Sequence, residues 1–171
     1  MGLFSKKSQD EKNFIREKNA VFMGETQQTI GNIQVGKLVS LRLDPANEKL
    51  LIVLGQTEIS LPYNRITGFA VESETNLVNG KVSIGGAVVG AAFFGGVGAL
   101  IGANKNKGKT KNKWFASLTY IDKDGNPQEL LFVEYAVLAP YDKQNKSISA
   151  LNFTSAIMGI VGRYQEAITE L

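Results

Sequence analysis

The sequence predicts an α+β fold that is mainly β, built from short antiparallel strands and a C-terminal amphipathic helix. Apolar segments of strand length occur in pairs separated by turn residues, as in β-hairpins. The C-terminal segment instead places its apolar residues three and four positions apart, as on one face of a helix. A chain of 171 residues, 43% of them hydrophobic, is long and apolar enough for one domain with its own core.

Residues 1–25 are expected to form a polar N-terminal tail or helix outside the sheet. Between residues 5 and 20 the only large apolar side chains are Phe14 and Ile15, which is typical of a solvated segment. The β pattern follows this segment, so the domain is predicted to cover residues 26–171.

The first half of the sheet is predicted to be a meander of short antiparallel strands. Residues 44–47 read Asp-Pro-Ala-Asn, a composition that favours a turn between two apolar segments. Gly55 and Gln56 permit a second reversal of the chain. The predicted strands lie at residues 37–43, 48–54, 57–61 and 66–72.

The second half of the sheet is predicted to be a hairpin, which the closing helix follows. Residues 114–121 and 128–135 are rich in aromatic and β-branched side chains, and turn residues separate them. The helix is expected to begin between Ser147 and Asn152. Its apolar stripe consists of Phe153, Ile157, Ile160, Val161, Tyr164, Ile168 and Leu171.

The composition excludes most familiar enzyme chemistry. The chain has 0 Cys and 0 His, which removes thiolate nucleophiles, imidazole acid–base groups and the ligands of most zinc sites. The acidic residues 122–127 resemble a calcium loop, but Pro127 stands where such a loop needs glycine, so we interpret them as a hairpin turn. Glu72 and Glu74 are interpreted as a solvated strand edge. We therefore expect no enzyme activity, no cofactor and no metal site.

An apolar, glycine-rich segment interrupts the domain between its two β blocks. Residues 82–103 carry no charge, and Ser83 is their only polar side chain. Because the strands on both sides are expected to share one sheet, we predict a helical hairpin that turns near residues 95–96 rather than a single membrane-spanning helix. Close packing of its arms is assigned to Gly86, Gly90, Gly98 and Gly102. Apolar contact with a membrane is assigned to Val88, Val89, Phe93, Phe94, Leu100 and Ile101.

A lysine run follows the apolar segment and completes an insertion that covers residues 82–113. Its five positive charges exceed the formal net charge of +3, so the rest of the chain is slightly acidic. Lysines beside an apolar segment are typical of contact with an anionic cytoplasmic leaflet. We assign contact with anionic lipid to Lys105, Lys107, Lys109, Lys111 and Lys113.

Two stretches of the sequence carry a resemblance to a known family. Residues 59–69, which read Ile-Ser-Leu-Pro-Tyr-Asn-Arg-Ile-Thr-Gly-Phe, together with the strand order and the closing helix, resemble bacterial pleckstrin-homology-like (PH-like) or GRAM-like domains. The glycine-rich block at residues 85–102, the lysines behind it, residues 120–125 and residues 131–132 are similar to the glycine-zipper insertion of uncharacterised bacterial proteins of this kind.

This resemblance covers about residues 30–171 and implies a strongly bent antiparallel sheet, or partly open barrel, that the helix closes at one end. It also implies an adaptor for lipid or protein. Lipid-binding members of the family carry cations on the loop between their first two strands, and residues 44–47 contain none. We therefore expect any contact with anionic lipid at the lysine run instead.

Together these features predict a non-enzymatic, cytoplasmic PH-like adaptor. It would contact the inner face of a membrane peripherally, or self-assemble there, through the glycine-zipper hairpin and the lysine run. The alternative is a protein-binding or assembly module whose hairpin is buried against the sheet or against a protein partner. Binding of nucleic acid by the lysines is a third, disfavoured alternative, because Trp114 and Phe115 beside them are expected in the core.

Overall fold

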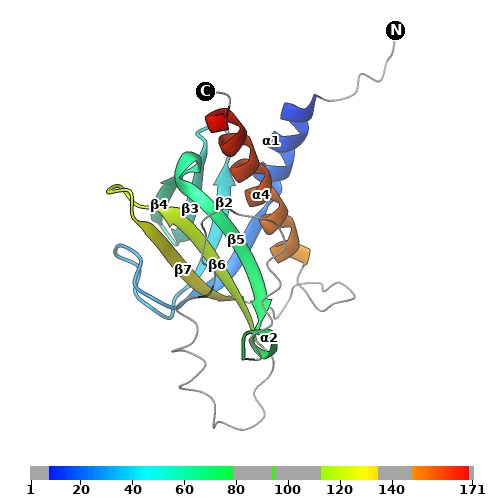
Figure 1. Ribbon diagram of the computed structural model, residues 1–171. Coiled ribbons are helices and arrows are strands. Elements are labelled where there is room, and N and C mark those ends of the chain that lie inside the picture. Colours follow the sequence, from blue (N-terminus) through cyan, green and yellow to red (C-terminus); the bar gives the residue numbers. More distant parts are fainter. Residues whose placement is uncertain (1–7, 79–93, 95–112, 135–147, 170–171) are drawn as a thin grey trace.

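The computed structural model describes residues 8–78, 94, 113–134 and 148–169. These contain the helices α1 (Gln9–Asn19), α2 (Glu74–Val78) and α4 (Ile148–Thr169) and the short 3₁₀ helix η1 (Tyr63–Arg65). The strands are β1 (Val21–Thr26), β2 (Leu38–Asp44), β3 (Lys49–Leu54), β4 (Thr57–Pro62), β5 (Ile66–Ser73), β6 (Trp114–Ile121) and β7 (Pro127–Glu134). They form one antiparallel sheet in the order β4-β3-β2-β1-β7-β6-β5 (Figure 1).

The predicted class, α+β and mainly β, is confirmed. Strands β2 to β7 each lie within about one residue of the bounds expected from alternation and turn composition. Helix α4 begins at Ile148, inside the expected window. The turn after β6 is also confirmed, because the Asp122 carboxylate accepts hydrogen bonds of 2.9 Å from the backbone N–H groups of Asp124 and Asn126. The bond from Asn126 is the main reason that the pKa of Asp122 lies below its ordinary value.

Strand β1 was not predicted. Residues 1–25 are expected outside the sheet from their polar pattern, whereas Val21–Thr26 lie in its middle, between β2 and β7. A glycine in an inward-facing position hides the apolar alternation of this strand. A Cβ at Gly24 would lie 2.7 Å from the ring of Phe22 and 3.0 Å from the Cβ of Phe132, so close packing requires glycine there.

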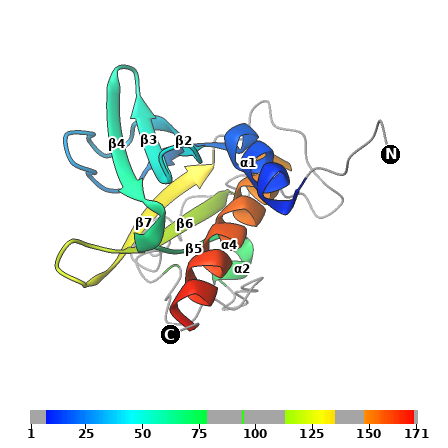
Figure 2. The same cartoon turned by 90° about the horizontal axis from the view of Figure 1, so that it is seen from above.

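The sheet curls around a single main core. Phe22 of β1 and Phe69 of β5 lie with their ring centres 5.4 Å apart, edge to face. In a flat sheet their strands would be about 14 Å apart, because β7 and β6 lie between them and neighbouring strands are spaced by about 4.8 Å. Seen from above, β2–β4 and β5–β7 accordingly lie at an angle to each other (Figure 2).

Helix α4 covers the open side of this curl and packs mainly on β5 and β1. Its buried residues include Phe153, whose ring centre lies 4.9 Å from that of Phe69. Ile157, Ile160 and Val161 are buried on the same stripe, as the spacing of apolar residues predicted. The amphipathic C-terminal helix is therefore confirmed.

Candidate functional site

The insertion leaves and re-enters the sheet at one place. Strands β5 and β6, which precede and follow it, pair directly, with Ser73 opposite Trp114. Just beyond them, the backbone N–H of Glu74 donates a 2.8 Å hydrogen bond to the carbonyl of Lys113. A single membrane crossing would place the two ends on opposite sides of the bilayer, so this pairing does not fit one. The shape of the insertion itself lies outside the described residues.

One residue of the glycine-rich segment is described, and it docks on the sheet. Phe94 is 7% exposed and forms a second apolar cluster with Ala70 of β5, Phe115 of β6 and Leu131 of β7. Leu77 and Val133 pack around this cluster. These strand residues face away from the main core, because they alternate with core residues along each strand. We call this surface the outer face of β5–β7.

This outer face explains why alternation is weak along β6. Phe115 and Ser117 point to the outer face, while Ala116 and Leu118 point into the main core. All of these side chains are buried, so β6 is covered on both sides. A strand buried on both faces reads as a continuous apolar run rather than as an alternating one.

A carboxylate fixes the backbone of the docked residue. Glu129 of β7 accepts a hydrogen bond from the backbone N–H of Phe94, and the same oxygen accepts a 2.6 Å bond from the hydroxyl of Ser117. Phe94 has a φ of 63°, in the left-handed region, which costs a non-glycine residue roughly 1–2 kcal/mol. Burial of its ring and the bond to Glu129 offset that cost. Together, these contacts form a docking site for one apolar residue of the insertion.

A buried carboxylate also holds the helix that leads toward the insertion. Glu72 is 1% exposed, which corrects its interpretation as part of a solvated edge. Its side chain accepts hydrogen bonds from the backbone N–H of Ser73 at 3.1 Å and from the amide of Asn76 at 2.6 Å. Glu72 therefore ties α2 to the end of β5, where the chain leaves the sheet.

The structure describes Phe94 and Lys113 among the sequence-predicted site residues. Lys113 is exposed just before the beginning of β6, whereas Phe94 is buried against the sheet. The others lie outside the described residues: Gly86, Val88, Val89, Gly90, Phe93, Gly98, Leu100, Ile101, Gly102, Lys105, Lys107, Lys109 and Lys111. No helix within the described ranges is both long and apolar enough to cross a membrane. The same ranges contain no group of acidic side chains suited to hold a metal ion.

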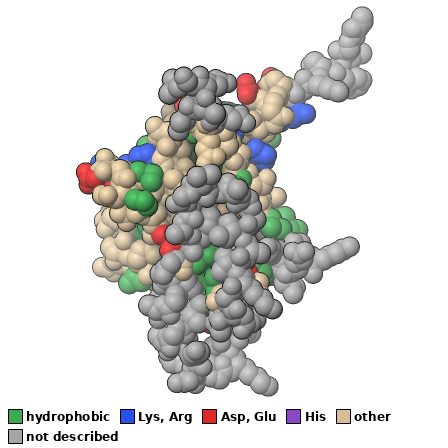
Figure 3. Space-filling view, in the orientation of Figure 1, with side chains coloured by type: hydrophobic (Ala, Val, Ile, Leu, Met, Phe, Trp, Pro, Cys, Tyr) green, Lys and Arg blue, Asp and Glu red, His purple; other side chains and the backbone are tan. Residues whose placement is uncertain are grey.

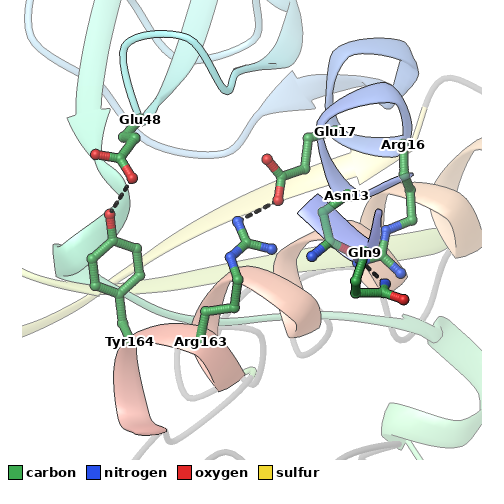
Figure 4. Close-up of polar contacts among 7 residues, drawn as sticks. All are labelled: Gln9, Asn13, Arg16, Glu17, Glu48, Arg163 and Tyr164. Atoms are coloured by element: carbon green, nitrogen blue, oxygen red, sulfur yellow. Dashed lines mark hydrogen bonds and ion pairs between the residues drawn. The ribbon is translucent and has the colours of Figure 1, made fainter. Parts of the chain in front are cut away.

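A polar cluster that no sequence motif indicates lies where α1, η1 and α4 meet. Glu17 of α1 is 2% exposed and forms an ion pair with Arg163 of α4, while the hydroxyl of Tyr164 donates a 3.2 Å hydrogen bond to Glu48 (Figure 4). Nearby, Tyr63 is almost fully buried. Burial, reinforced by the charge of Glu17, raises the pKa of Tyr63. The two residues of each contact, Glu17 with Arg163 and Tyr164 with Glu48, lie more than one hundred residues apart in the sequence. No local motif could therefore reveal this cluster.

Charges on the face of the molecule drawn in Figure 3 do not form a patch of one sign. On the face drawn in Figure 3, acidic and basic side chains are interspersed. This distribution agrees with the sequence, in which the positive excess belongs to the lysine run.

No protein-family model matches this chain, and no curated protein matches it. Among solved structures, it is similar to one titled as Inner Membrane Complex Sub-compartment Protein 3 from Toxoplasma gondii. The similarity covers 95% of this chain and 91% of that one, at 10% identity and a TM-score of 0.42. At these values the likeness is too distant to support an argument about function.

Proposed function

We propose that this protein is a non-enzymatic adaptor of PH-like architecture that assembles with a second copy or with a protein partner through its glycine-rich segment. The PH-like part is supported by a seven-stranded antiparallel sheet that curls around one core, with α4 packed across it. The choice of protein over lipid as the surroundings of the segment rests on Phe94, because the described residue of the segment is covered by Ala70, Phe115 and Leu131 of its own chain.

The experiment that tests assembly enlarges the glycines assigned to close packing. Gly90→Leu and Gly98→Leu are expected to lower the association measured by sedimentation velocity, because a large side chain prevents close approach of the arms. Gly162→Leu is the matched control, since a Cβ at this position in α4 has no neighbour within 4 Å. Unchanged association in both variants, with an unchanged circular dichroism spectrum, would overturn the assembly proposal.

Membrane contact is the second candidate function, and the lysine run favours it. Lys113 is exposed at the end of that run, and each lysine near an anionic surface contributes on the order of 1 kcal/mol. Liposome flotation with anionic and neutral vesicles tests this function. We expect flotation with anionic vesicles, lost when the five lysines are replaced by glutamine and lost at high salt. Absence of the wild-type chain from the floating fraction would eliminate membrane contact and leave protein assembly intact.

A further inference from the structure

Two arginines from different helices meet at a glycine of α4. A Cβ at Gly159 would lie 2.5 Å from Nη2 of Arg16 and 3.9 Å from Nη1 of Arg163. The guanidinium of Arg16, which comes from α1, therefore rests on the backbone of α4 at a position where any larger residue would displace it. The side chain of Arg163 reaches the same position from the next turn of α4.

One described carboxylate serves these two cations. Glu17 forms its ion pair with Nη2 of Arg163, whereas Nη1 of Arg163 is buried and has no hydrogen-bond partner among the described residues. Arg16 donates a 3.3 Å hydrogen bond to the amide oxygen of Asn13 (Figure 4). Within the described ranges Arg16 forms no ion pair. The junction of α1 and α4 thus carries a positive charge that no described carboxylate neutralises.

A small pocket opens beside Arg16, with described walls on two sides. Arg16, Asn19 and Ala20 line it from the end of α1, and Asn152 and Ser155 line it from α4, around a volume of about 260 Å³. The side chains of the two asparagines and the serine make no hydrogen bonds to other described residues. A guanidinium, two carboxamides and a hydroxyl therefore face this pocket with N–H and O–H groups to donate. We call it the α1–α4 pocket.

The charges that α1 and the first half of α4 place around this pocket favour an anion. At about 100° per residue, Asp10 and Glu11 lie roughly 120–140° around α1 from Arg16. Lys12, four positions before Arg16, lies instead on the same side of the helix. Helix α4 has no charged residue before Arg163.

We propose that the α1–α4 pocket binds a phosphate monoester. The planar fork of Arg16 binds two phosphate oxygens by charge-assisted hydrogen bonds, while Asn152 and Ser155 donate to the others from the facing helix. A tetrahedral phosphate accepts bonds from both walls, whereas the guanidinium alone satisfies a flat carboxylate. The volume of about 260 Å³ lies below the roughly 300 Å³ at which pockets for drug-sized ligands begin. The ligand is therefore small. This inference goes beyond the proposed adaptor function and does not depend on assembly.

Titration of the full chain with glycerol phosphate tests the proposal. Binding is followed by amide NMR spectra at about 0.15 M salt, where weak surface attraction is screened. We expect saturable shifts at the backbone N–H signals of Arg16, Asn152 and Ser155. Arg16→Gln, which removes the charge and keeps most of the length, is expected to weaken binding about tenfold or more. Asn152→Asp is expected to abolish it, because a carboxylate of the same size then pairs with Arg16 in place of the ligand.

Matched controls separate this pocket from general attraction of anions. Lys18 is exposed on the opposite side of α1 from Arg16, so Lys18→Gln loses the same charge and is expected to bind glycerol phosphate like the wild type. Acetate, as a carboxylate probe, is expected to bind more weakly than glycerol phosphate. Absence of saturable shifts, equal binding of the two probes, or equal weakening in the Arg16 and Lys18 variants would overturn the proposal.

A flotation experiment identifies the source of the phosphate. It uses the chain with glutamine at the five positions of the lysine run, so that this run does not contribute, and vesicles with phosphatidic acid, a lipid phosphate monoester. Flotation that Arg16→Gln removes supports a lipid source, whereas glycerol phosphate binding without flotation supports a soluble one. Phosphatidylcholine vesicles, which carry a phosphate diester, are the control. In sedimentation, Arg16→Gln is expected to associate like the wild type, so failure of this proposal leaves the proposed assembly intact.

Discussion

The rings of Phe69 and Phe153 meet edge to face with centres 4.9 Å apart, and this contact joins β5, at the edge of the sheet, to the closing helix α4. Phe22 of β1 contacts both, at 5.4 Å from Phe69 and 6.2 Å from Phe153. Three elements far apart in sequence thus share one aromatic cluster. It lies where the curl of the sheet is closed by α4, so the fold depends on it.

We therefore predict that Phe153→Ala destabilises the protein by about 3–5 kcal/mol, the usual cost of removing a buried aromatic ring. The loss would appear in the free energy of unfolding in urea. Ile148→Ala is the matched control, since Ile148 lies on the same helix and is 41% exposed, and its effect is expected within about 0.5 kcal/mol. Similar costs for both variants would show that α4 does not close the core.

The ion pair between Glu17 and Arg163 is predicted to fasten α1 to α4. Glu17 is 2% exposed while the Arg163 side chain is 37% exposed, so the pair is worth less than a fully buried one. We expect Glu17→Ala and Arg163→Ala each to cost about 1–3 kcal/mol. In the double variant the costs should fall short of additivity by about 0.5 kcal/mol or more. Additive costs would contradict a direct interaction.

Tyr63 is predicted to make the protein sensitive to alkaline pH. Its pKa is raised in the folded state by burial, so above its ordinary value of 10.0 the unfolded chain loses this proton first. The stability of the protein is therefore unaffected by this shift below pH 10 and falls as the pH rises further. Tyr63→Phe removes this pH dependence. Within the described residues its hydroxyl has no hydrogen-bond partner, so at neutral pH the variant should be as stable as the wild type or slightly more stable.

The measurement is urea unfolding of both proteins at pH 7 and at about pH 11. The pKa values of Tyr120 and Tyr164 are raised as well, mainly by burial. Their contributions are present in both proteins, so the difference between wild type and variant isolates Tyr63. An identical loss of stability in the two proteins would contradict a shifted Tyr63.

The regular strands and α4 could be predicted because their signals are local. Apolar segments between turn residues fixed β2 to β7, and the helical stripe with Phe153 and Ile157 fixed α4. Strand β1 escaped this reasoning because Gly24 occupies an inward-facing position for a packing reason, namely the approach of Phe132 on the neighbouring strand. The contact depends on the pairing of β1 with β7 in the folded sheet, so no local pattern in the sequence indicates it.

The site residues were harder to predict, and for the same reason. Glu17 and Glu72 appear in the sequence as ordinary charged residues, and their burial depends on partners supplied by the fold. Phe94 was recognised as part of an apolar segment, but the residues that bury it come from three strands, β5, β6 and β7, on the outer face of the sheet. Composition identifies such a residue as apolar without saying whether lipid or protein covers it.

Photo-crosslinking from position 94 tests the central claim most directly. Phe94 is replaced by p-benzoylphenylalanine in the full chain, and the adducts formed on irradiation are mapped by mass spectrometry with and without anionic vesicles. We predict adducts within the protein, on Ala70, Phe115 or Leu131, which pack around Phe94. We predict the same adducts with and without vesicles. Adducts on lipid, or none on strands β5 to β7, would contradict a glycine-rich segment that docks on the sheet.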